Sequence, residues 1–285
     1  AGKERAVKRL LAHPSLVIGL AATLVFLALG LLSLVWTPYP IEQIDIPRRY
    51  LAPSAAHWLG TDNLGRDMLS LVMAGTWTSF LVAAVAVAIG VGLGVPLGLA
   101  AAAWGGAVEW LVLRLTDFVF AFPAVIVAIL ITTLVGPGAV NAIVAIGIFN
   151  IPVFARVARG GALSIATLDF VAAGKLAGLG NTLIAWRHLL PNIMSLIIVQ
   201  GTIQMSLGIL SEAGLSYIGL GTQPPETSLG LMLKDAQSVF LIHPWLTLVP
   251  GLAIVLIVIA LNIAGDGLRD AIDPRLRQGN SNVLA

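Results

Sequence analysis

Six long apolar runs constrain the fold of this chain more than any other feature of its sequence. A helix needs roughly 20 apolar residues to cross the hydrocarbon core of a bilayer, and each run approaches that length. None of the runs alternates apolar and polar residues as the strands of a membrane β-barrel do. The sequence therefore predicts an all-α integral membrane protein with six transmembrane helices, at 16–36, 76–103, 115–135, 139–158, 193–213 and 245–264.

The composition agrees with a surface that faces lipid. Charged residues make up only 11% of the 285 residues, whereas a soluble domain carries about 25%. The net charge is +2 and the basic residues are scattered, which argues against nucleic-acid binding. The absence of cysteine excludes disulfides and thiolate metal sites. His57, His188 and His243 are dispersed along the chain, so no metal site is expected.

The basic residues predict how the chain crosses the membrane. A basic segment precedes the first apolar run, as in a signal peptide. No small-x-small cleavage site follows the run, so we interpret it as an uncleaved span. With the N-terminus in the cytosol, 12 of the 16 lysines and arginines lie on the cytosolic side, as the positive-inside rule favours. Six spans then place both termini in the cytosol. The basic residues outside are Arg48, Arg49, Arg66 and Lys234.

The largest cytosolic loop, at about 164–192, has a pattern of its own. Small residues such as Ala172, Ala173 and Gly174 predict a thin helix over 166–179 that can lie in a groove of a partner. Gly178 is expected to end this helix, because glycine accepts the left-handed conformation. A second short helix is expected at 182–190, with Pro191 breaking it before the fifth span. The alternative is an interfacial hairpin without a partner.

Glycine and polar residues within the spans suggest packing and a path. Gly90, Gly94 and Gly98 share one helix face, which predicts close packing of two helices, with a bend at Pro96. Polar groups in spans usually face the interior of a bundle. The alternative for each amide is a hydrogen bond between helices, and for Glu212 a brace of the loop that follows it. The candidates for a translocation path are Thr132, Thr133, Asn150, Gln200, Gln204, Asn262 and Glu212.

The stretch FVAAGKLAGLGNTLIAWRHLLPN, at 170–192, resembles the EAA loop of permease subunits of ATP-binding-cassette (ABC) importers. In that family the loop forms a coupling helix that docks on a cytosolic ATPase. The pattern fits without gaps. Two positions differ from the family pattern: Ala172 stands where the family has an acidic residue, and Gly174 stands where it has its second alanine. The resemblance therefore lies in the small residues and the shape of the loop rather than in its charge. The implied ATPase-coupling residues are Phe170, Ala172, Ala173, Gly174, Lys175, Gly178, Arg187, His188 and Pro191.

Further stretches resemble one branch of that family. HWLGTDNLGRDMLS, at 57–70, is similar to a segment of dipeptide, oligopeptide and nickel importer permeases, and 212–225 and 250–277 resemble the end of the same subunits. Together they indicate the C-type subunit of a permease pair. The resemblance implies a type I ABC importer transmembrane domain at 76–285. The region 1–75 would hold a cytosolic segment, the first transmembrane helix and an extracytoplasmic loop.

The resemblance implies a subunit that forms half of a path for di- or oligopeptides across the cytoplasmic membrane of a prokaryote, by alternating access. The implied partners are a B-type permease, two ABC ATPase subunits, an extracytoplasmic substrate-binding protein and lipid. No G-x-x-x-x-G-K-[ST] is present, so ATP and Mg would be used by partner subunits and no cofactor is expected on this chain.

The cargo and other classes of protein remain as alternatives. Relatives in this family also handle nickel chelates and heme. A secondary transporter would need ionisable groups near mid-membrane, whereas Asp117 and Glu212 lie at the ends of predicted spans. A channel has no use for a projecting helix. An enzyme is not expected, because no constellation such as H-E-x-x-H occurs.

Overall fold

The regular secondary structure of the protein is helical throughout the range that the computed structural model describes, residues 13–272. One isolated β-bridge joins Thr61 and Asp67. The helices are α2 (Pro14–Leu32), α3 (Met68–Ile89), α4 (Val95–Trp104), α5 (Gly106–Phe120), α6 (Ala124–Val135), α7 (Ala139–Ile165), α8 (Asp169–Leu176), α9 (Asn181–Ile184), α10 (Leu190–Tyr217), α11 (Leu229–Ala236) and α12 (Trp245–Ile272).

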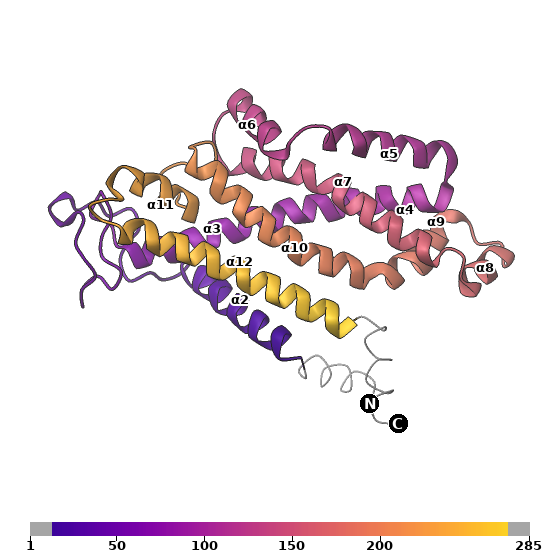
Figure 1. Ribbon diagram of the computed structural model, residues 1–285, viewed down its shortest axis with the longest axis horizontal. Coiled ribbons are helices and arrows are strands. Elements are labelled where there is room, and N and C mark those ends of the chain that lie inside the picture. Colours follow the sequence, from indigo (N-terminus) through magenta and orange to yellow (C-terminus); the bar gives the residue numbers. More distant parts are fainter. Residues whose placement is uncertain (1–12, 273–285) are drawn as a thin grey trace.

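The long helices form an elongated bundle (Figure 1). Helices α3, α7 and α10 contact one another at its centre, α2 and α12 pack together on one side, and α5 and α6 lie against α7 on the other. Helices α8 and α9 lie at one end, which we call the α8 end. The loop 37–67 and α11 lie at the opposite end, the α11 end. Helix α2 begins, and α12 ends, on the side toward α8.

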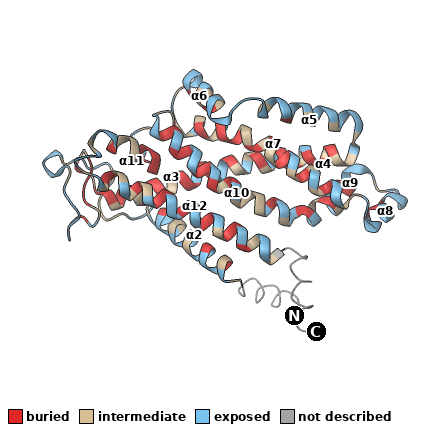
Figure 2. Ribbon diagram, in the orientation of Figure 1, coloured by how far each residue is buried: buried red, intermediate tan, exposed pale blue. Residues whose placement is uncertain are grey.

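The six predicted spans are present, but one of them is broken. Five helical stretches are long and apolar enough to cross a membrane, and α5 with α6 forms a sixth that bends by 79°. The prediction of one continuous helix over 115–135 is therefore wrong. Residues 121–123 leave the helix, because Pro123 has no N–H to donate and its ring clashes with the preceding turn. Many residues on the long helices are exposed (Figure 2), and a large share of these are apolar, as expected of a surface that faces lipid.

The second span is longer than predicted. Residues 68–104 form one helical stretch, in which the π-helical turn Gly90–Gly94 joins α3 to α4. Asp67 caps its start, since the Oδ2 atom accepts a hydrogen bond from the N–H of Ser70 at 2.8 Å. The boundary expected between 75 and 76 falls inside α3. Pro96 lies in the first turn of α4, directly after the π-helical turn.

The interpretation that Pro191 ends a separate short helix is wrong. Residues 181–217 form one helical stretch of 37 residues, which contains the π-helical turn Ala185–Leu189. Pro191 lies in the first turn of α10, directly after that turn. In a π-helical turn, each N–H group donates to the carbonyl group five residues earlier. Pro191 follows this turn at the start of α10, a position where the missing N–H group of proline costs little.

The predicted glycine face is confirmed as a close helix contact. A Cβ atom on Gly90 would overlap the side chain of Asn150, and one on Gly98 would overlap the carbonyl oxygen of Ala155. Both partners belong to α7, so α3 and α4 approach the α7 backbone where glycine leaves room. Between residues 13 and 272, three buried clusters make up the core, and the one nearest α8 joins α4, α7 and α10 to α8 and α9.

Candidate functional site

Helix α8 is a short amphipathic helix at one end of the bundle. Val171 and Gly174, three residues apart, share its buried face. The Val171 side chain packs into the cluster formed with Ile184 and Leu189, so the helix is anchored on its own chain. The residues exposed on its other face are Ala172, Ala173, Lys175 and Leu176.

The turn after α8 has a defined hydrogen-bond pattern. Gly178 has a φ of +80°, which confirms the predicted left-handed residue. Its N–H donates to the carbonyl of Lys175 at 3.0 Å, and the N–H of Leu179 donates to the carbonyl of Gly174 at 3.1 Å. This pair of bonds is the Schellman motif. These two bonds satisfy carbonyl groups in the last turn of α8 and fix the end of the helix.

Only some of the predicted coupling residues come together. Phe170 and His188 have ring centroids 6.3 Å apart, and a Cβ on Gly174 would lie 3.7 Å from the Nε2 atom of His188. Gly174 is therefore buried against residues of this chain. The physical reason is helical periodicity, which puts it on the same face as Val171. Arg187 and Pro191 are exposed on the returning helix.

The polar residues of the spans divide into a connected group and isolated ones. The Nε2 atom of Gln204 donates to the Oδ1 atom of Asn150 at 2.7 Å, and Gln200 donates to Gln204 at 3.4 Å. This group joins α7 to α10. Thr132 is buried and donates to the carbonyl of Ala128 in its own helix. Thr133, and Asn262 on α12, are exposed on the chain surface.

Glu212 is fully buried within a cage of hydroxyl groups. Ser79 on α3 donates to its Oε2 atom at 2.8 Å, and Ser216 donates to its Oε1 atom at 2.6 Å. Thr222, in the loop after α10, donates to Oε1 at 3.3 Å. The exposed fraction of Glu212 is 0%. These contacts tie α3 and α10 to the loop that leads to α11, as a brace would.

Replacing Glu212 by alanine is expected to lower the free energy of unfolding by at least about 2 kcal/mol, because buried hydroxyls lose their acceptor. Glu212→Gln retains one acceptor and should cost about half as much. Thermal unfolding of the protein in detergent measures both. Unchanged stability of Glu212→Ala would contradict the role of a brace.

The described geometry is that of a helical membrane bundle with a projecting amphipathic helix, and residues 94–278 match the family described as "Binding-protein-dependent transport system inner membrane component". The chain belongs to this family. The match confirms the resemblance to importer permeases, and it covers Gly94 and Gly98 of the glycine face and the whole of α8.

Individual relatives agree with the membership. The permease is 38% identical over 266 residues to the glutathione transport system permease protein GsiD of Pectobacterium atrosepticum, covering 93% of this chain and 88% of that protein. It is 36% identical to the dipeptide transport system permease protein DppC of Alkalihalophilus pseudofirmus, covering 96% and 90%. A chain of the inward-facing MetNI methionine ABC transporter matches in fold, with a TM-score of 0.58 at 20% identity, covering 72% of this chain and 98% of that chain. The expected type I importer fold is confirmed.

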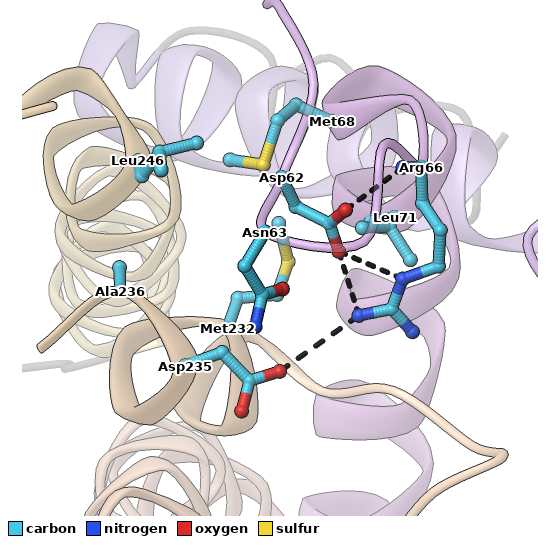
Figure 3. Close-up of a pocket in the computed structure, with 9 residues that line it drawn as sticks. All are labelled: Asp62, Asn63, Arg66, Met68, Leu71, Met232, Asp235, Ala236 and Leu246. Carbon is cyan, nitrogen blue, oxygen red and sulfur yellow. Dashed lines mark hydrogen bonds and ion pairs between the residues drawn. The ribbon is translucent and has the colours of Figure 1, made fainter. Parts of the chain in front are cut away.

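The α11 end of the permease carries a folded loop, built on the stretch singled out at 57–70. Asp62 accepts hydrogen bonds from the N–H groups of Leu64 and Arg66. Its Oδ2 atom pairs with the guanidinium of Arg66 at 2.7 Å (Figure 3). Arg66 also approaches Asp235 of α11 at 3.8 Å. Burial raises the pKa of Asp235 above its ordinary value of 3.8, and Arg66 opposes that shift.

A cavity at the α11 end was missed by the sequence reasoning. Its volume is about 630 Å³, within the range typical of ligand sites. Its walls come from the end of α2, from α3, from the start of α7 and from residues 226–227, with polar groups of Thr78, Asn141 and Glu226. No local pattern signals it, because these segments are distant in sequence.

Proposed function

We propose that this permease forms one half of the transmembrane path of an ATP-driven importer of short peptides. The cargo is inferred from the relatives named above, two of which are permeases for glutathione and for dipeptides. The other half would be a B-type permease subunit. A substrate-binding protein would deliver the peptide at the α11 end, and two ATPase subunits would dock at the α8 end and use ATP and Mg. Both termini would lie in the cytosol with α8.

The observation that carries the proposal is the exposed face of α8. It presents Leu176, with 90% of its surface exposed, at the C-terminal end of a helix anchored through Val171, and Leu168 and Phe170 are exposed at the N-terminal end. An apolar tip that is held rigidly is suited to transmit the motion of a docked subunit. ATP binding by the ATPases would then move the spans from inward-open to outward-open, and hydrolysis would reset them.

The proposal is tested by reconstitution into proteoliposomes. We expect ATP-dependent uptake of a labelled dipeptide only when this chain is combined with the second permease, the ATPases and the binding protein. The chain alone should bind no ATP and take up nothing. Uptake by vesicles that contain only this chain would refute the proposal, as would a complete complex that transports no peptide.

A further inference from the structure

The break between α5 and α6 exposes irregular backbone within a membrane span. Residues 121–126 are exposed, and the helices on either side meet at 79°. The last carbonyls of α5 and the first N–H groups of α6 have no partners within their own helices. Irregular backbone does not face lipid in the hydrocarbon core, because unpaired polar groups cost several kcal/mol there. This face of the subunit therefore meets water or protein.

An exposed ion pair lies beside the break. The Arg156 guanidinium on α7 contacts the Oδ1 atom of Asp117 on α5 at 2.6 Å, and it lies 4.4 Å from the centre of the Phe120 ring. The side chains of Asp117 and Arg156 are 55% and 43% exposed. Exposed charges of this kind face a path or a partner rather than lipid.

The depth of the pair corrects the sequence-based placement of Asp117 at a span end. The span begins at Gly106, so Asp117 lies about three turns inside α5. Arg156 lies about 25 Å along α7 from Ala139. A hydrocarbon core of about 30 Å that starts at Ala139 would include it.

We propose that Asp117 and Arg156 line the water-filled path and bind the two charged ends of a peptide. Asp117 would accept hydrogen bonds from the α-ammonium group, and Arg156 would donate to the α-carboxylate. In the empty path the charges of Asp117 and Arg156 neutralise each other. When a zwitterionic peptide binds, its ammonium group takes the place of Arg156 beside Asp117, and its carboxylate takes the place of Asp117 beside Arg156, so the net charge of the site does not change. Phe118, which follows Asp117 in the sequence, and Phe122, whose ring lies 5.5 Å from that of Phe118, are both exposed and offer apolar surface to the cargo side chains. The assignment of a peptide rests on the proposed function.

A second ion pair on the same two helices supplies a matched control. The Nε atom of Arg159 donates to Glu109 at 2.8 Å, so this pair also ties α7 to α5. Both of its side chains are only 28% exposed, and Glu109 lies about two turns from Asp117 along α5. A role limited to holding α5 against α7 would be shared by both pairs, whereas cargo binding would be confined to the more exposed one.

The first experiment tests exposure to water and needs no cargo. This chain contains no cysteine, so Phe118→Cys and, at an exposed position of α12, Leu256→Cys each place a single thiol in it. The complete complex is assembled with partner subunits whose own cysteines have been replaced. In nanodiscs, which leave both membrane faces accessible, a membrane-impermeant thiol reagent should label Phe118→Cys at least about tenfold faster, because thiolates form in water and not in lipid. Equal, slow labelling of both positions would overturn the assignment to the path.

The second experiment measures how far dialanine slows the labelling of Phe118→Cys. N-acetylation or C-terminal amidation of the peptide should each raise the half-protecting concentration by about tenfold, which corresponds to one charge-assisted hydrogen bond. Asp117→Asn in the same background should abolish the difference between free and acetylated dialanine, and Arg156→Gln the difference between free and amidated dialanine. Glu109→Gln should leave protection unchanged.

Equal protection by free and blocked peptides, or an equal loss with Glu109→Gln, would overturn the proposal. If Phe118→Cys is labelled rapidly but neither free nor blocked dialanine slows the labelling, the peptide-binding role is overturned. The exposure of this site to water would still be established. ATP-driven uptake, measured separately, decides the proposed function itself.

Discussion

Replacing Gly98 by valine is expected to lower the free energy of unfolding by about 3 kcal/mol or more. A Cβ at this position would overlap the carbonyl oxygen of Ala155 and lie 2.9 Å from the Cβ of Ala158. The obstacle includes backbone of α7, so it cannot be relieved by a side-chain rotation. Overpacking of a core alone costs about 1–3 kcal/mol. Separation of α4 from α7 would also remove packing contacts and lower the free energy of unfolding further. Thermal unfolding in detergent measures the total change.

The matched control is Gly92→Val, in the π-helical turn that precedes α4. A Cβ on Gly92 meets nothing within 4 Å, and the residue is exposed. Its replacement should change the free energy of unfolding by less than about 1 kcal/mol, in line with surface substitutions in helices. Similar losses at both positions would show that the cost arises from a β-branched residue in this helical stretch rather than from contact with α7.

Replacing Leu176 by aspartate is expected to reduce ATP-driven peptide uptake at least tenfold while the fold persists. The side chain is 90% exposed on α8, so its loss should change the free energy of unfolding by less than about 0.5 kcal/mol. In a docked complex the carboxylate would be buried without a partner, and central interface residues typically cost about 2 kcal/mol or more when changed. Co-purification of the ATPases and uptake by proteoliposomes measure the effect.

Leu241→Asp is the control at the opposite end of the molecule. Leu241 is 92% exposed and follows α11, so the same change in chemistry is made away from α8. Retention of the ATPases should be normal for Leu241→Asp and impaired for Leu176→Asp. Normal retention and uptake with Leu176→Asp would show that the apolar tip of α8 takes no part in docking.

The existence of the spans could be predicted because it depends only on the length of an apolar run. The break at Pro123 could not be placed, because the residues on both sides of it are apolar. The interpretation of Pro191 failed for a related reason. A proline signals a helix end by its missing N–H, but the π-helical turn at Ala185–Leu189 accommodates that loss without a break.

The candidate sites divide in the same way. Gly178 was predictable because a left-handed residue after a helix leaves a local signal, and its φ of +80° agrees. The cage around Glu212 was not, because its Ser79 partner is 133 positions away in sequence. Asp117 was placed at a span end because the start of that span at Gly106 lies in a stretch that also carries Glu109 and Arg114.

The continuous helix over 181–217 reaches from the α8 end of the bundle toward the α11 end. At 37 residues it is about 55 Å long, with the π-helical turn beside α8 at one extremity and Glu212 near the other. Tilting a rod of that length by about 5° sweeps its far end through roughly 5 Å. The 2.8 Å hydrogen bond between Ser79 and Glu212 cannot lengthen by that amount. During such a tilt, α3 must therefore move together with this helix, or the hydrogen bond must break.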